Sequence, residues 1–233
     1  AGMLRVNSLQ ELFLAAETLA RFRTNRSESL IILTNGGGAG VMAADAAAQV
    51  NVPLTELGAP TLAQLDAVLP ANWSHGNPVD IIGDAPVKRY GEALQILHND
   101  PNGAAVLFIH APTAIVPSAE IATALSALPQ SATAWLMGCW LGGHGVEAAR
   151  QLFKGAGIAD YPTPEEAVRA FSMLLNFHRN QAELMEAPPV LPVGTPAEAA
   201  PDKAVVKAIV RAALSSGREM LNEAEAKAVL EAY

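Results

Sequence analysis

The chain has 233 residues, of which 51% are hydrophobic and 16% are charged, and its formal net charge is −8. This size suits one large α/β domain or a smaller domain with an appendage, and the hydrophobic fraction is ample for a core. The acidic balance argues against a nucleic-acid partner, and the apolar runs are too short to span a bilayer. The single cysteine, Cys139, excludes an internal disulfide and fits a reducing cytoplasm. Because neither end carries a clear start or stop signal, we expect a piece of a longer cytoplasmic protein.

The first half of the chain alternates short apolar runs with helical patterns. A strand over 3–6 precedes a helix that Ser8 caps, and the apolar residues from Leu9 to Ala20 are expected to form one buried stripe. A buried strand over 30–33 then leads through a glycine-rich turn into an alanine-rich helix. Three further elements follow, namely a short strand over 54–57, a helix opened by a capping box at Thr61, and a helix capped by Asp84.

The second half continues the alternation, with strands over 104–109, 134–137 and 158–161 that each precede a helix. Strands that alternate with helices predict a doubly wound, mostly parallel sheet. Residues 187–201 are rich in proline and alanine and indicate a linker. Residues 202–233 carry two helical patterns, which are too few to build a core alone.

The passage Thr34-Asn35-Gly36-Gly37-Gly38-Ala39-Gly40 joins the buried strand to the alanine-rich helix. Glycines let a ligand approach the backbone closely, and the first amides of a helix favour a phosphate or a carboxylate. The same glycines would also suit a tight packing turn without a ligand. The passage is not a dinucleotide-binding fingerprint, because Val41 stands in the place of the third glycine. It is not a P-loop either, because no Gly-Lys-Ser/Thr follows.

Three loops are expected at one edge of the sheet, where ligands of doubly wound sheets bind beyond the carboxyl ends of the strands. They are the glycine turn, the loop from His110 to Thr113, and the loop from Gly142 to His144. One anion-accepting cleft is the economical interpretation. His75, His110 and His144 lie in loops, where a histidine serves a function about as often as it satisfies local backbone groups.

The other reactive side chains favour structural roles. Asp80 and Asp84 offer oxygen ligands for Mg²⁺, although capping is the better interpretation for Asp84 and the role of Asp80 stays open. Cys139 is expected to be a small buried hydrophobe rather than a nucleophile. The sequence contains no Cys/His cluster with metal-ligand spacing, so it predicts no metal site.

Two motifs resemble a known family. Leu33 to Val41 with Ala44-Asp45, followed by Asn77-Pro78-Val79-Asp80 with Gly83-Asp84-Ala85, are similar to the third domain of NDP-forming (ADP-forming) acyl-CoA synthetases. That flavodoxin-like domain is similar to the carboxyl-terminal domain of the succinyl-CoA synthetase beta subunit. The resemblance runs from about Leu4 to His178 and implies a flavodoxin-like CoA-ligase domain over 1–186. Residues 202–233 resemble the lead-in to the ATP-grasp module that follows in fused members.

The resemblance implies an activity for the longer protein. Acyl-CoA, phosphate and ADP would give a carboxylic acid, CoA and ATP through an acyl-phosphate and a phosphohistidine. The phosphohistidine belongs to the preceding domain of the family, so this chain would hold no catalytic residue and would be inactive in isolation. CoA or acyl-CoA, ATP or ADP, and Mg²⁺ would serve the full-length protein, and none would bind tightly here. The implied partners are the CoA-binding, phosphohistidine and ATP-grasp domains of the same polypeptide, and a homo-oligomer stays open.

The resemblance also implies three sets of site residues. The glycine turn would steady the phosphorylated histidine through the dipole of its helix, and the loop from His110 would line an acyl or carboxylate pocket. The phosphate-binding residues would be Asn35, Gly36, Gly37, Gly38 and Ala39, the pocket residues His110, Ala111, Pro112 and Thr113, and the supporting residues Asn77, Pro78 and Asp80.

Two other functions remain open at this point. A second branch of the same architecture carries a GNAT domain and modifies protein lysines, and its synthetase-like part serves as an acyl-CoA-sensing regulator. The stretches His110 to Pro117 and Arg179 to Gln181 resemble that branch of acetyltransferases. A third hypothesis is a packing and oligomerisation module that binds no ligand.

Overall fold

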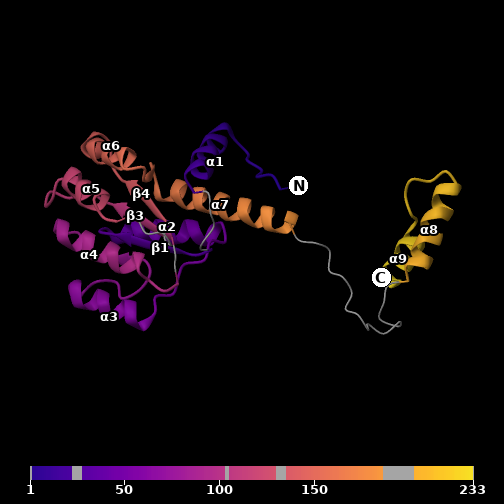
Figure 1. Ribbon diagram of the computed structural model, residues 1–233, viewed down its shortest axis with the longest axis horizontal. Coiled ribbons are helices and arrows are strands. Elements are labelled where there is room, and N and C mark those ends of the chain that lie inside the picture. The colour runs from indigo at the N-terminus through magenta and orange to yellow at the C-terminus, as the bar shows by residue number, and fades with distance from the viewer. Residues whose placement is uncertain (1, 23–27, 103–104, 130–134, 186–201, 233) are drawn as a thin grey trace. The chain divides into compact units, whose positions relative to one another are not determined.

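The computed structural model describes residues 2–22, 28–102, 105–129, 135–185 and 202–232 (Figure 1). The chain divides into two compact units, Ala1–Met185 and Glu186–Tyr233. The linker expected over 187–201 lies outside the described residues. None of the described helices combines the length and the apolar character that a bilayer crossing requires.

A parallel sheet forms the centre of the first unit, and its strands follow the order β2-β1-β3-β4-β5 in the described part of the chain. This is the flavodoxin-like order of a doubly wound sheet, so the predicted fold class is confirmed. Thr34 lies opposite Ile109 in the register, which sets the carboxyl ends of β1 and β3 side by side. The strands are β1 (Leu30–Thr34), β2 (Val79–Asp80), β3 (Ala105–His110), β4 (Leu136–Trp140) and β5 (Ala159–Tyr161).

Helices cover both faces of this sheet (Figure 1). Alternate strand residues point to opposite faces, so Ile31 and Leu33 pack with one set of helices, and Leu30 and Ile32 with the other. All four side chains are fully buried, which stabilises the fold by roughly 1.5–3 kcal/mol for each. The first face carries α3 (Ala59–Val68), α4 (Val87–His98), α5 (Ser118–Ser126) and α6 (Glu147–Gly155), and the second carries α2 (Gly37–Gln49) and α7 (Pro164–Met185), with α1 (Leu9–Arg21) against α7.

The start of the chain differs from the sequence-based expectation. Residues 2–7 form no strand, because the segment lies along the end of α7, where the Asn180 side chain donates to the Met3 carbonyl at 3.1 Å. Ser8 does cap α1, since its hydroxyl accepts the Glu11 amide at 3.1 Å. The predicted buried stripe is wrong, because Leu9 and Phe13 are 73% and 71% exposed.

The buried face of α1 is instead partly polar. Ala15 and Thr18 are its buried residues, and the Thr18 hydroxyl lies 3.0 Å from the hydroxyl of Tyr161 on β5. A hydrogen bond to a buried tyrosine satisfies both hydroxyl groups, which lets a threonine replace an apolar residue at this contact. The hydrophobic pattern of α1 therefore pointed to the wrong side of the helix.

Two helix starts were also predicted wrongly. Helix α3 begins at Ala59, and Thr61 is buried inside it with its hydroxyl donating to Asp100 at 2.5 Å. Helix α4 begins at Val87, and Asp84 contacts Arg89 at 2.6 Å instead of capping the helix. The strand expected over 54–57 reduces to a single bridge between Leu30 and Leu54.

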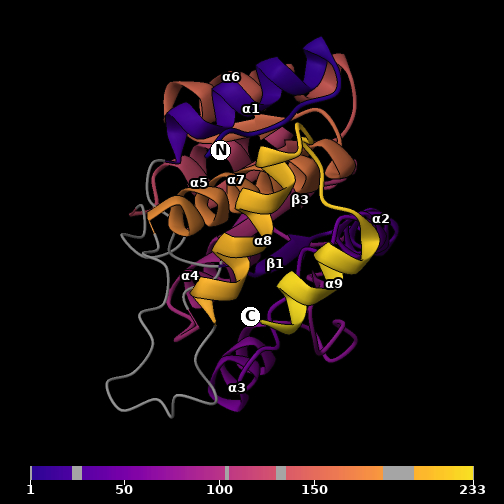
Figure 2. The ribbon, with the colours of Figure 1, turned by 90° about the vertical axis from the view of Figure 1, so that its right-hand side faces the viewer.

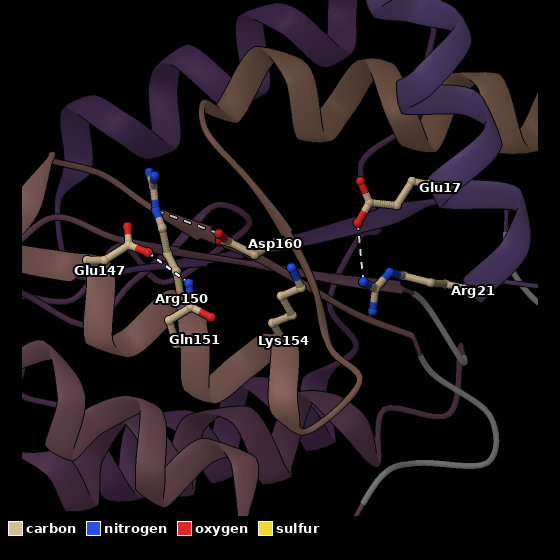
Figure 3. Close-up of a pocket in the computed structure, with 7 residues that line it drawn as sticks. All are labelled: Glu17, Arg21, Glu147, Arg150, Gln151, Lys154 and Asp160. Atoms are coloured by element: carbon tan, nitrogen blue, oxygen red, sulfur yellow. Dashed lines mark hydrogen bonds and ion pairs between the residues drawn. The ribbon is translucent and has the colours of Figure 1, made fainter.

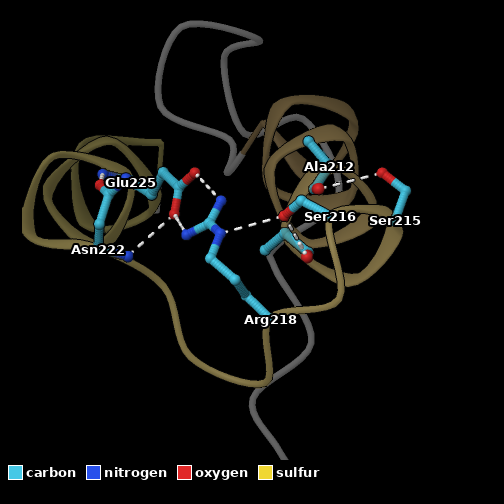
Figure 4. A network of polar contacts seen from close by, with 7 residues as sticks. Ala212, Ser215, Ser216, Arg218, Asn222 and Glu225 are labelled. Carbon is cyan, nitrogen blue, oxygen red and sulfur yellow. Dashed lines mark hydrogen bonds and ion pairs between the residues drawn. The ribbon is translucent and has the colours of Figure 1, made fainter.

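The second unit consists of α8 (Lys203–Ser215) and α9 (Glu223–Glu231), which lie side by side (Figure 2). Asp202 caps α8, and Asn222 and Glu225 form a complete capping box at α9. The guanidinium of Arg218 donates to both carboxylate oxygens of Glu225, at 2.8 and 2.7 Å, and to the Ser216 hydroxyl at 3.0 Å (Figure 4). This network fixes the turn between the two helices.

Candidate functional site

The glycine turn leaves two amides free at the start of α2. The Gly36 amide donates to the Thr34 hydroxyl at 3.0 Å, and the Gly36 carbonyl accepts the amides of Ala39 and Gly40 at 3.0 and 3.2 Å. The amides of Gly37 and Gly38 have no hydrogen-bond acceptor among the described residues. Free amides at the positive end of a helix dipole form a site for an anion.

A reciprocal pair of hydrogen bonds joins this turn to the loop after β3. The Asn35 side chain donates to the Ala111 carbonyl at 2.8 Å and accepts the Ala111 amide at 2.9 Å. Asn35 is only 3% exposed, so its side chain holds the two loops together and does not reach solvent. The pair spans β1 and β3, the position where ligands bind in sheets of this order.

Close contacts explain why the turn is built from glycine. A Cβ on Gly36 would lie 2.9 Å from the Cβ of Ala111, and a Cβ on Gly37 would lie 2.9 Å from an Asp80 carboxylate oxygen. Gly38 has open space around it. Gly36 is therefore required for packing, because the Cβ of Ala111 cannot move away, whereas a Cβ at Gly37 would displace the Asp80 side chain. Gly38 leaves room next to its free amide.

Asp80 brings a negative charge to this helix terminus. One of its carboxylate oxygens accepts the Ile82 amide at 2.9 Å, and the other faces Gly37. Ile82 has φ of +68°, a left-handed conformation that costs a β-branched residue about 1–3 kcal/mol. The strained turn carries Gly83 to within 3.6–3.9 Å of Asn35 and Thr113, measured from the position a Cβ would take. Sequence analysis missed Ile82, and no feature of the sequence marks it.

Asn77 holds the open side of β1. Its carboxamide accepts the Ile32 amide at 2.9 Å and donates to the carbonyls of Leu30 and Thr55 at 2.9 and 3.0 Å. The neighbouring Pro78 follows a cis peptide bond and lies against Gly40 of α2. Asn77 and Pro78 thus place β2 and Asp80 beside the helix terminus.

His110 lies beneath the site rather than in it. The side chain is fully buried, its Nε2 is 3.1 Å from the Ser118 hydroxyl, and the rings of Tyr90 and Trp140 pack around it. Burial lowers the pKa of His110 to about 4, so the ring is neutral near pH 7. Ala111 is half-buried, whereas Pro112 and Thr113 are exposed and face the edge of the sheet.

The remaining candidates lie away from this edge or are inert. His75 contacts the Asp66 carboxylate and the Ala71 carbonyl, both at 3.0 Å. Cys139 is fully buried, and burial raises the pKa of its thiol to about 12, so it behaves as the small hydrophobe expected. Nowhere in the described ranges do three His, Cys, Asp or Glu side chains come together as a metal site.

Comparisons with known proteins agree with the fold. The sequence model of the Ligase-CoA domain matches residues 30–185. The ADP-forming acetate–CoA ligase I of Archaeoglobus fulgidus is 35% identical over 233 residues, which is all of this chain and 32% of that protein. The alpha subunit of ADP-forming acetate–CoA ligase I from Pyrococcus furiosus is 31% identical over 193 residues, covering 80% of this chain and 40% of that subunit.

A solved structure shows the same arrangement. The dinucleotide-forming acetyl-coenzyme A synthetase 1 of Ca. Korarchaeum cryptofilum, in complex with phosphate and ADP, superposes with a TM-score of 0.73 at 27% identity. The superposition covers 82% of this chain and 41% of that one, so the chain spans one third to two fifths of these relatives. Because the domain match covers more than half of its residues, the chain belongs to the Ligase-CoA domain family of the NDP-forming acyl-CoA synthetases.

Proposed function

We propose that this chain supplies a phosphate and acyl subsite to a multidomain NDP-forming acyl-CoA synthetase. The whole enzyme would convert acyl-CoA, phosphate and ADP to a carboxylic acid, CoA and ATP through an acyl-phosphate and a phosphohistidine. The observation that carries the proposal is the pair of free amides, Gly37 and Gly38, at the amino end of α2. Two amides and a helix dipole stabilise a phosphoryl group without a catalytic side chain.

We propose different roles for the residues of this subsite. Gly37 and Gly38 would contact the phosphate, whereas Asn35, Gly36 and Ala39 already use their polar groups to shape the turn. The acyl group would lie against the loop from Ala111 to Thr113, which we name the acyl loop. His110 would support this loop from below, because its ring is buried.

The charge of Asp80 limits how phosphate can arrive. A carboxylate beside Gly37 repels an anion unless a cation accompanies it. The described residues hold no group of three metal-binding side chains, so Mg²⁺ would come with the ligand or with another domain. We therefore propose that other domains of the polypeptide supply the phosphohistidine, CoA and the nucleotide.

The domain arrangement is part of the same proposal. Residues 1–186 would be the flavodoxin-like third domain, and 202–233 would lead into an ATP-grasp domain in the cytoplasm. The Archaeoglobus fulgidus ligase supports this assignment, because its similarity extends over the whole chain and includes α8 and α9. The relatives reported above are ligases and a synthetase, so we favour this function over an acyl-CoA-sensing part of a GNAT acetyltransferase.

Titration with inorganic phosphate and with acetyl phosphate tests the proposed subsite. In ¹H–¹⁵N NMR spectra of the 233-residue chain, the amide signals of Gly37 and Gly38 should move on addition of either ligand together with Mg²⁺. The Gly38→Pro variant lacks one amide donor and should weaken this response, whereas Gly38→Ala keeps the amide in open space and should respond like the parent. Shifts spread over the surface, with no difference between the two variants, would support the packing module without a ligand.

A further inference from the structure

A charged cavity of about 260 Å³ lies over the edge strand β5, between α1 and α6 (Figure 3). At its inner end the carboxylate of Asp160 on β5 faces the guanidinium of Arg150 on α6, with 3.6 Å between Oδ2 and Nε. Arg150 Nε and Asp160 Oδ1 are buried and make no hydrogen bond among the described residues. The two groups therefore interact as an ion pair, and the remaining polar atoms of Arg150 are directed elsewhere.

The other end of the Arg150 guanidinium holds the main chain after β4. Its Nη2 donates to the Trp140 carbonyl at 2.7 Å and lies 3.5 Å from the Gly142 carbonyl. The first carbonyl ends β4, and the second belongs to the loop that follows. A planar guanidinium fixed at two sides has one orientation, so Asp160 determines which backbone atoms Arg150 reaches.

This loop bonds to the last residue of β3 and lies beside the acyl loop. The Leu141 amide donates to the His110 carbonyl at 3.0 Å. Gly142 has φ of +107°, and a Cβ placed on it would lie 3.5 Å from Cγ of Pro112. A shift of the Gly142 backbone therefore moves the surface on which Pro112 rests.

We propose that Arg150 and Asp160 are positioning residues for the acyl loop. The Asp160 carboxylate orients the Arg150 guanidinium, and the guanidinium holds Leu141–Gly143 against Pro112. Neither side chain touches the proposed ligand. The name of the acyl loop rests on the proposed function, but the contact between the two loops does not.

The same pair makes the position of the loop depend on pH. Burial raises the pKa of Asp160 to about 6, against the opposing effect of Arg150, so the carboxylate gains a proton as the pH falls from 7 to 5. The neutral acid no longer attracts Arg150, whose side chain is 27% exposed and can turn to water. The hydrogen bonds from Arg150 to the Trp140 and Gly142 carbonyls then weaken.

Several other charged groups lie around Asp160, and the charges of Glu147 and Glu17 add to the rise in its pKa. On α1, Glu17 and Arg21 pair at 3.2 Å, and on α6 the Glu147 carboxylate accepts from Gln151 at 2.8 Å. Lys154 of α6 lines the cavity without a partner in the described part of the chain (Figure 3). Helix α7 begins with Glu165 and Glu166. Arg150 is therefore the cation that pairs with Asp160.

NMR spectra of the 233-residue chain between pH 5 and pH 8 test this inference. His144 lies in the neighbouring turn, so every sample carries His144→Gln, which removes its imidazole from the comparison. In the parent, the amide signals of Leu141, Gly142 and Gly143 should shift with a midpoint near pH 6. Asp160→Asn should abolish this titration, and its signals should resemble those of the parent at pH 5.

Two further variants separate positioning from general packing. Glu147→Gln removes another acid of the same cavity that does not contact Arg150. Because the charge of Glu147 helps to raise the pKa of Asp160, the titration should persist in this variant with a lower midpoint. Arg150→Lys keeps the charge but loses the planar fork, and it should lose the pH-dependent shift. Signals that do not titrate in the parent, or a titration that survives Asp160→Asn, would overturn the inference. The experiment needs no ligand, so a failed phosphate titration would reject the proposed function and leave this result standing.

Discussion

Asn35 and Ala111 exchange two hydrogen bonds across the carboxyl ends of the central strands β1 and β3. A side chain here takes the place of backbone pairing at a position where the parallel strands separate. The amide and carbonyl of Ala111 make no other hydrogen bond among the described residues. The geometry of the proposed site thus depends on one carboxamide.

Asn35→Ala should therefore lower the free energy of unfolding by about 2–4 kcal/mol, since it leaves two backbone groups of Ala111 without partners. Denaturant unfolding at pH 7 measures the change. Asn99→Ala is the matched control, because Asn99 is exposed and makes a single side-chain bond to the Gln95 carbonyl. Equal destabilisation by the two variants would contradict the structural role of Asn35.

Gly36 and Gly38 of the turn should respond differently to alanine. Gly36→Ala places a methyl group 2.9 Å from the Cβ of Ala111, which cannot swing away, so we expect a loss of about 1–3 kcal/mol. Gly38→Ala meets open space in a helix and should be neutral or stabilising by up to about 1 kcal/mol. Thermal or urea unfolding of the two variants gives the comparison. A stabilising Gly36→Ala would show that the loops are not in contact in solution.

Buried histidines should make the fold sensitive to acid. Burial lowers the pKa of both His98 and His110 to about 4, whereas an unfolded histidine titrates near 6.5. The unfolded chain therefore binds the extra protons between pH 6.5 and pH 4, and each histidine removes about 3 kcal/mol of stability over that range. Asp160 acts in the opposite sense, because its raised pKa lets the folded state take up a proton first. After this offset, the net loss of folding stability on acidification should equal the contribution of one histidine.

Urea unfolding at pH 7 and at pH 4.5 measures this loss. His98→Leu should reduce the difference between the two pH values, because Nε2 of His98 is buried without a partner among the described residues and an apolar side chain does not titrate. His75→Gln serves as the control, since it removes an exposed histidine rather than a buried one. An unaltered difference in His98→Leu would show that His98 is not the source.

The sequence predicted the central strands β1, β3 and β4 because strands buried on both faces give unbroken apolar runs, as in Leu30 to Leu33, but it did not predict β2. The sequence also located the glycine turn, because a cluster of glycines between an apolar strand and a helix is typical of a turn. It failed at α1, where Thr18 is buried by a hydrogen bond to Tyr161 that lies 143 residues away. Side-chain bonds between distant residues leave no periodic signal, and the bond from Thr61 to Asp100 likewise made the start of α3 unpredictable. At α4 a local contact is responsible, because Asp84 pairs with Arg89 instead of capping the helix.

The candidate site shows the same limit. The motif at Asn77 indicated a supporting loop, but the three bonds that fix β1 and the strained Ile82 emerge only from the folded backbone. Residues in the site were assigned through resemblance, and resemblance does not tell which amides are free. Only the hydrogen-bond pattern distinguishes Gly37 and Gly38 from their neighbours.

The turn between α8 and α9 offers a local test of electrostatics. The hydrogen bonds from Arg218 lower the pKa of Glu225 to about 2, with a further contribution from the Asn222 backbone amide. A carboxyl whose folded pKa is lowered stabilises the unit above its unfolded pKa, and the contribution disappears as the pH falls toward 2. The capping box at α9 should therefore persist at pH 4 and open below pH 3.

NMR titration of the Glu225 carboxyl group measures this pKa directly. Arg218→Gln removes the charged partner and should raise the pKa of Glu225 toward 4.5, so that the capping box opens at a higher pH. Lys227→Gln is the matched control, because Lys227 pairs with Glu223 at 2.8 Å and not with Glu225. A Glu225 titration that is unchanged in Arg218→Gln would mean that the bidentate pair does not form in solution. The turn would then be held by the capping box alone.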